Sequence, residues 1–83
     1  MQTSAVFANL HNAAVDQLLE FYCAWREECA QVHTAYMRLS SASQPDRTLA
    51  FAAYIAALDR EAAAAHMYLE QVNRVASWIR LRR

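Results

Sequence analysis

The sequence predicts an all-α fold, an antiparallel hairpin of two long helices. Three observations lead to this prediction. The 83 residues contain no glycine and only one proline, so the tight turns that glycine permits and the kinks that proline imposes are scarce. Loop-forming residues gather in a single segment near the middle of the chain. On both sides of it, apolar residues recur every three or four positions, which is the period of an α-helix and not of a strand.

The segment that separates the two helices is Ser-Ser-Ala-Ser-Gln-Pro-Asp, residues 40–46. Its small polar residues and its proline are typical of a loop. Ser43 suits an N-cap, and Pro45 and Asp46 suit a first helical turn, where a missing N–H and a negative charge are both well accommodated. The predicted arrangement is a single domain over residues 1–83, with a first helix over about 4–39, a loop over 40–46 and a second helix over about 44–82.

Each predicted helix carries an apolar line that suits packing against the other helix. In an antiparallel hairpin, residues whose numbers add up to about 86 lie at the same level, so Tyr22 and Trp25 face the small residues Ala62 to Ala65. Large side chains against small ones let two helices approach closely. The line of the first helix is Phe7, Leu10, Ala14, Leu18, Phe21, Trp25, Cys29, Val32, Tyr36 and Leu39. The line of the second helix is Phe51, Ile55, Leu58, Ala62, Ala65, Leu69, Val72, Ala76 and Ile79.

The second helix also has another line of the same period, with several aromatic members: Tyr54, Ala57, Glu61, Ala64, Tyr68, Gln71, Val75 and Trp78. The first helix similarly has apolar residues to one side of its main line, among them Leu19 and Met37. We expect these surplus residues to stay exposed in one hairpin, and such apolar strips mark association surfaces. The alternative is that they are ordinary scattered surface residues.

The sequence therefore predicts a non-enzymatic protein–protein interaction or adaptor module that acts as a homodimer. Two hairpins that close into a four-helix bundle are the simplest solution. A further protein partner is compatible with this interpretation. The expected interface residues are Tyr54, Tyr68, Val75 and Trp78 of the second helix and Leu19 of the first.

A metal-binding bundle is the second interpretation. Asp16 and Glu20 lie one turn apart, as do His66 and Glu70, and the hairpin register brings the two pairs level. Carboxylates and imidazoles on facing helices hold iron or manganese in bundle proteins. However, Asp16 and Glu20 point away from the main line of their helix, and a solvated charged face explains all four residues. We assign no metal and no cofactor.

A small regulator that touches nucleic acid is the third interpretation. Arg74, Arg80, Arg82 and Arg83 lie near the end of the second helix, and Trp78 between them could stack on a base. Arginines at this end also complement the helix dipole, which explains them without a ligand. Eight arginines balance eight acidic residues over the whole chain, whereas nucleic-acid binders usually carry a basic face. Nucleic acid is therefore not an expected partner.

Several other classes of function lack support in the sequence. Nucleophilic catalysis needs an activated Ser or Cys next to an oriented base, and no such arrangement is visible, so we do not expect an enzyme. There is no apolar run of about 18 residues and no secretory signal, so we expect a cytoplasmic protein without a membrane span. Cys23 and Cys29 lie about 9 Å apart along one helix, beyond disulfide reach, so we expect free thiols.

Overall fold

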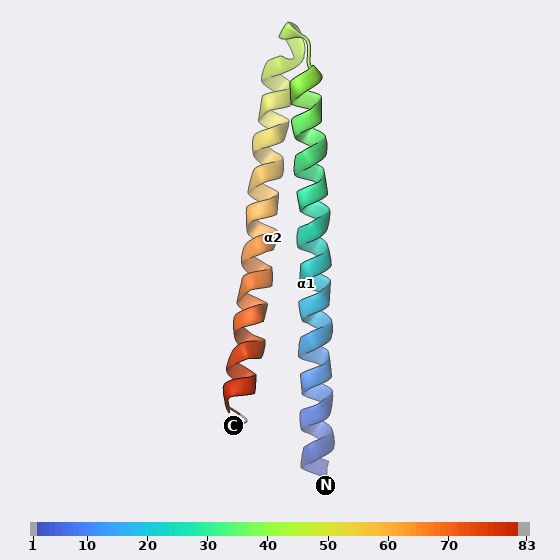
Figure 1. Cartoon of the computed structure of the whole chain (residues 1–83), viewed down its shortest axis with the longest axis vertical. Helices are drawn as coiled ribbons and strands as arrows, with labels where there is room; N and C mark the ends of the chain where they lie inside the picture. The colour runs from blue at the N-terminus through green and yellow to red at the C-terminus, as the bar shows by residue number, and fades with distance from the viewer. Residues whose placement is uncertain (1, 82–83) are drawn as a thin grey trace.

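The computed structural model describes the backbone of residues 2–81 and the side chains of residues 9–81. The chain forms helix α1 over Gln2–Ser41, a short 3₁₀ helix η1 over Gln44–Asp46 and helix α2 over Arg47–Leu81. The two long helices run antiparallel and side by side, with both ends of the chain at the end opposite the loop (Figure 1). We call that end the open end. The predicted all-α hairpin is confirmed.

The turn is made by side chains that bond to the backbone, and it needs no glycine. The hydroxyls of Ser40 and Ser41 donate to the carbonyls of Tyr36 and Met37, each at 3.0 Å. Such bonds compete with the next helical turn for the same carbonyls. Ser43 then takes an extended conformation, and no described residue has a positive φ. The chain therefore reverses within conformations that any L-residue adopts.

The start of the returning chain differs in detail from the expected cap. Ser43 does occupy the N-cap position, before η1 instead of α2, but its hydroxyl makes no cap bond to a backbone N–H. It donates to the Asp46 carboxylate at 3.0 Å, and the Asp46 backbone N–H donates to the Ser43 carbonyl at 3.0 Å. Pro45 lies in the first turn of η1, as the sequence predicts.

Hydrogen bonds between the helices show how the hairpin is aligned. The Trp25 indole N–H donates to the Glu61 carboxylate at 2.8 Å, and the Gln71 amide donates to the Ala14 carbonyl at 3.1 Å. Both pairs match the predicted register. Ring contacts continue the same alignment from the open end to the loop end of the hairpin, at His11 with Trp78, Trp25 with Tyr68, and Tyr36 with Tyr54.

The line of α2 that faces α1 is the opposite of the one expected. Ala57 and Gln71, both from the second line, are 1% and 3% exposed, and they are the two buried residues in the described part of the chain. Tyr54, Glu61, Ala64, Tyr68, Val75 and Trp78 are half-buried. Phe51, Ile55, Leu69 and Ile79, which were assigned to the hairpin contact, are 40–56% exposed. Leu58, Ala65 and Val72 of the same line are half-buried. The second line therefore lies at the centre of the seam and the first along its edge, so the predicted assignment of the two lines was wrong.

The physical reason lies in what the half-buried Trp25 requires. An indole N–H removed from water needs an acceptor. The second line supplies one at Glu61, and its small members Ala57 and Ala64 still let the helices approach. The first line offers the same close approach at Ala62 and Ala65 but no acceptor. Because both lines have the same period, periodicity could not decide between them.

The apolar line of α1 is placed largely as expected. Its middle members Ala14, Leu18, Phe21, Trp25, Cys29, Val32 and Leu39 are half-buried, whereas Leu10 and Tyr36 are 51% and 52% exposed. The side chain of Phe7 lies outside the described residues. Within residues 2–81, neither long helix contains an apolar run sufficient to cross a bilayer.

We predict that Ala57→Leu destabilises the hairpin by about 1–3 kcal/mol, because three added carbons overpack a closed contact. Ala56→Leu is the matched control, since the neighbouring Ala56 is exposed. Urea denaturation followed by circular dichroism measures both. Equal stability of the two variants would show that Ala57 does not face α1.

Candidate association surface

One hairpin leaves most of its apolar residues in contact with water. The chain exposes 6509 Å², whereas a compact monomer of 9.5 kDa exposes about 5,000 Å². Its radius of gyration is 18.9 Å, against about 12 Å for a globular domain of this length. The molecule is a rod with extents of 67 × 16 × 12 Å. It has a seam between two helices but no enclosed core.

Seven of the exposed large apolar residues lie along one long side of the rod, which we call the apolar face, namely Leu19, Tyr22, Tyr36, Phe51, Ile55, Leu69 and Ile79, whereas Leu10, Met37, Leu49, Met67 and Leu81 lie outside it. On each helix they follow positions three and four apart, and such positions share one side of a helix. From α1 the face contains Val15, Leu18, Leu19, Tyr22, Trp25, Cys29, Val32, Tyr36 and Leu39, with the polar Asn12, Arg26 and His33 along its outer edge. From α2 it contains Phe51, Tyr54, Ile55, Leu58, Ala62, Ala65, Tyr68, Leu69, Val72, Val75, Ala76 and Ile79, together with the charged Glu61.

Contacts across the seam show that the two sets lie on the same side of the hairpin. Tyr22 meets Tyr68 with ring centroids 5.5 Å apart. Nearer the loop, Tyr36 meets Tyr54 at 6.0 Å. Phe51 lines one shallow groove with Leu39 at the loop end. The apolar face is therefore continuous across both helices.

An aromatic cluster with one carboxylate occupies the middle of this face. Trp25 stacks on Tyr68, with centroids 5.8 Å apart and planes 7° from parallel, and Tyr22 meets both rings. Glu61 accepts a hydrogen bond from the Trp25 indole at 2.8 Å, and the Cys29 thiol donates to the same oxygen at 3.9 Å. Within the described residues no cation lies within 4 Å of this carboxylate. The two groups that donate to this carboxylate, an indole N–H and a thiol, are both neutral.

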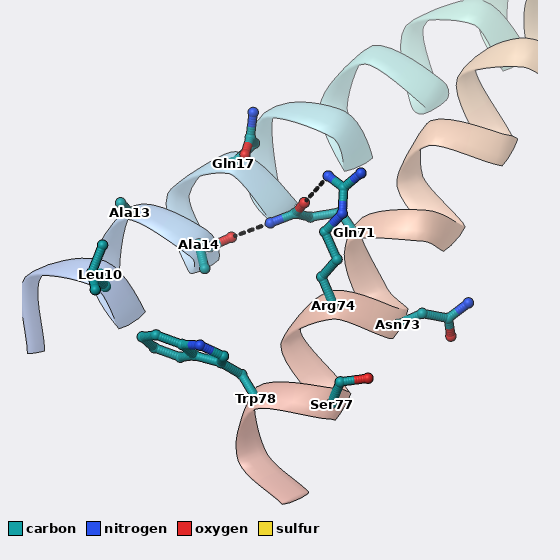
Figure 2. A pocket seen from close by; sticks show the side chains of 9 residues that line it. All are labelled: Leu10, Ala13, Ala14, Gln17, Gln71, Asn73, Arg74, Ser77 and Trp78. Atoms are coloured by element: carbon teal, nitrogen blue, oxygen red, sulfur yellow. Dashed lines mark hydrogen bonds between the residues drawn. The ribbon is translucent and has the colours of Figure 1, made fainter. Parts of the chain in front are cut away.

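The opposite side of the rod, which we call the polar side, carries charged side chains from both helices together with the exposed Leu10 and Met67. Arg60 pairs with Glu28 at 3.4 Å across the two helices. Near the open end, an open groove of about 620 Å³ lies between α1 and α2 (Figure 2). Gln71 closes its floor, donating to the Ala14 carbonyl while its own oxygen accepts from Arg74 at 3.3 Å. Trp78 extends toward Leu10 at the far end of this groove (Figure 2).

The predicted metal ligands are not brought together. His66 and Glu70 form an ion pair along α2 at 2.9 Å, with Arg74 4.0 Å from Glu70. Asp16 and Glu20 are exposed on α1. No three His, Cys, Asp or Glu side chains converge anywhere in the described part of the chain. Cys23 and Cys29 are free thiols, as expected.

The residues predicted to bind a second chain have two different placements. Tyr54, Tyr68, Val75 and Trp78 are half-buried against α1, and Trp78 stacks on His11 with centroids 6.1 Å apart. Leu19 is 57% exposed on the apolar face. Contrary to the prediction, α1 therefore partly covers all four of these α2 residues. Tyr54, Tyr68 and Val75 still border the apolar face.

Sequence reasoning missed the residues that α1 actually leaves open, namely Phe51, Ile55, Leu69 and Ile79, because it placed them inside the hairpin. The signal that could have found them was the need of Trp25 for an acceptor. Of the terminal arginines, Arg74 and Arg80 make hydrogen bonds along α2. Arg82 and Arg83 lie outside the described residues.

Comparisons of the chain with protein-family models, with curated proteins and with solved structures find no match. The function of the protein is therefore inferred from the surface of this molecule alone.

We predict that Trp25→Phe lowers the free energy of unfolding by at least about 1 kcal/mol, because the Glu61 carboxylate loses its strongest donor. Tyr22→Phe is the control, since it keeps the ring and removes only a hydroxyl on the same face. Chemical denaturation at matched protein concentration compares the two. A Trp25→Phe protein as stable as Tyr22→Phe would show that the indole–carboxylate bond contributes little.

Proposed function

We propose that this protein is a non-enzymatic interaction module that acts as a helical homodimer, in which the apolar faces of two hairpins pack together as a four-helix bundle. One observation carries the proposal, the continuous apolar face that the hairpin itself leaves uncovered. In a four-helix bundle each helix buries a strip about twice as wide as in a hairpin, because it contacts two neighbours.

The area involved supports an obligate dimer. Each copy exposes 6509 Å², roughly 1,500 Å² more than a compact protein of its mass. If two copies bury this excess, the interface covers about 3,000 Å², which is within the range of permanent homodimers. An interface of this size compensates for the enclosed core that a single hairpin lacks.

The chemistry of the face favours a second copy over a lipid or nucleic-acid partner. The chain carries as many acidic as basic residues, so it has no excess positive charge for phosphate or anionic lipid. The apolar face of a second copy is an apolar strip of the same length, so it can cover these residues along the whole rod. The polar side with its groove would remain exposed in such a dimer, and an adaptor role would use that side for a further protein partner.

We propose that the protein acts in the cytoplasm. Cys23 is an exposed free thiol, and exposed thiols persist in reducing compartments.

We predict that the native protein has the molar mass of a dimer, and that Leu69→Glu shifts it toward monomer or unfolds it. A charge at this position would have to be buried against apolar side chains, which costs several kcal/mol. Met67→Glu is the matched control, because Met67 is similarly exposed, at 49% against 56% for Leu69, but lies on the polar side. Multi-angle light scattering over a range of concentrations, with circular dichroism, measures both.

Two outcomes of this experiment would contradict the proposal. A native protein that is monomeric and fully helical at every concentration has no need of a second copy. A dimer that Met67→Glu disrupts and Leu69→Glu leaves intact would place the interface on the polar side.

We also predict that Glu61→Gln strengthens the dimer about tenfold, which corresponds to about 1.4 kcal/mol. Glutamine keeps an acceptor for the Trp25 indole and removes a charge that must lose water when the faces meet. Glu27→Gln, an equal change of charge at an exposed position, is the control. Sedimentation equilibrium gives the dissociation constants, and a weaker dimer for Glu61→Gln would mean that the carboxylate charge is matched by a cation across the interface.

A further inference from the structure

The outer line of α2 on the apolar face, from Phe51 to Ile79, has nearly symmetric spacing about Ala65; Leu58, Ala65 and Val72 in it are half-buried, and its other members are exposed. Leu58 and Val72 are each seven positions away from Ala65, and Phe51 and Ile79 are each fourteen. The remaining members fall into two pairs whose distances from Ala65 differ by one position, Ala62 with Leu69 and Ile55 with Ala76. Such a line can pack against a second, antiparallel copy of itself.

The side chains in these pairs complement one another in size. A large residue meets a small one in two of the pairs, Leu69 with Ala62 and Ile55 with Ala76. In the third pair Leu58 meets Val72. Phe51 and Ile79 meet at each end of the line. Around a two-fold axis every such contact occurs twice, because residue i of one copy meets residue j of the other and the reverse. The small Ala65 at the centre lets the two helix axes approach to about 10 Å, which leaves about 5 Å between facing Cα atoms.

We propose that the second copy binds with its α2 antiparallel to the first α2, with the two Ala65 residues meeting at the two-fold axis and the two loops at opposite ends of the bundle. This inference rests on the homodimer proposed above and specifies its geometry. The contact line from Phe51 to Ile79 is then about 42 Å long at 1.5 Å per residue.

The other symmetric arrangement places α2 on the partner's α1, with both loops at one end. It fits the polarity of the surfaces less well. The outer line of α1 on the apolar face includes Asn12, Arg26 and His33, all exposed. With the register of the hairpin, Ile55 would then lie level with residue 31 of the partner and Ala62 with residue 24, so the partner's His33 and the partner's Arg26 would each lie within one helical turn of these apolar residues. In the proposed arrangement the apolar line of α2 meets only itself, and Arg26 and His33 of α1 lie level with the partner's Asp16 and the partner's Asn9.

The aromatic cluster also favours an axis at Ala65. Tyr68 lies one turn from Ala65 and stacks on Trp25 at 5.8 Å. An axis at Ala65 brings the clusters of both copies to the middle of the bundle, where water is most fully excluded. Large aromatic residues at the centre of an interface contribute most of its binding energy.

Cysteine cross-linking tests the geometry in a chain that carries Cys23→Ser and Cys29→Ala and remains dimeric. Under mild oxidation, Ala65→Cys is expected to give a covalent dimer in nearly full yield, since Cα atoms facing across the axis fall within the 4.4–6.8 Å of a disulfide. Ala63→Cys, two positions away and exposed on the polar side, is the control and should not cross-link.

The alternative arrangement predicts a different product. There, Leu19→Cys and Leu69→Cys chains mixed in equal amounts would cross-link to each other, while Ala65→Cys would not cross-link to itself. That result would overturn the proposed orientation. A stable dimer in which Ala65→Cys does not cross-link would also overturn it and would leave the homodimer intact. A monomer at all concentrations would overturn both proposals, so the two failures are distinguishable.

A second measurement does not depend on a substitution inside the interface. Spin labels at the exposed Ser77, read by pulsed electron paramagnetic resonance, should be separated along the bundle by about 36 Å, because Ser77 lies level with residue 53 of the other copy. Loops at the same end would instead place the two labels at one level, separated only by the width of the bundle. A distance limited to that width would contradict the proposal.

Discussion

Two helices can cover only one narrow strip of each other, and this geometric constraint governs the whole molecule. The apolar residues of α2 occupy a band wider than that strip, and those of α1 extend to one side of it as well. The hairpin can therefore close the seam at Ala57 and Gln71 while the rest of the band stays in water. Because the surplus lies on the same side of both helices, it forms one surface. That surface is large enough to act as half of a core, which is the reason for proposing that a second copy covers it.

The contact between Trp25 and Glu61 decides which part of the band faces inward. An indole N–H that loses water must find an acceptor, because a buried donor without a partner costs about 1–3 kcal/mol. Glu61 accepts this bond at 2.8 Å, and the rotation of α2 that allows it also places Tyr68 on the indole ring. The same rotation turns Leu69 and Ile55 outward. The hydrogen bond that the Trp25 indole requires thus determines which apolar residues of α2 are available to another chain.

Alanine has two roles in this arrangement. At Ala57 and Ala64 it lets α2 lie close enough to α1 for hydrogen bonds such as that from Gln71 to the Ala14 carbonyl to form. At Ala62, Ala65 and Ala76 it leaves small positions on the outer line, where the proposed dimer would place larger residues of an identical helix. A chain without glycine uses alanine for close approach because alanine keeps the helix stable, whereas glycine weakens it by about 1 kcal/mol per residue.

The sequence by itself determined the class of fold, the position of the turn, the register of the hairpin and the surplus of apolar surface. Those features depend on local properties, namely helical period, loop-forming residues at 40–46 and composition, which the chain order contains directly. Only the tertiary structure decided which of two equally periodic lines of α2 faces α1, because that choice depends on the rotation of one helix about its axis. The structure therefore places the uncovered apolar surface of α2 at Phe51, Ile55, Leu69 and Ile79, and not at Trp78 and its neighbours as predicted. It also separated Asp16 and Glu20 from His66 and Glu70, since residues at the same level can still point to different sides of a helix pair.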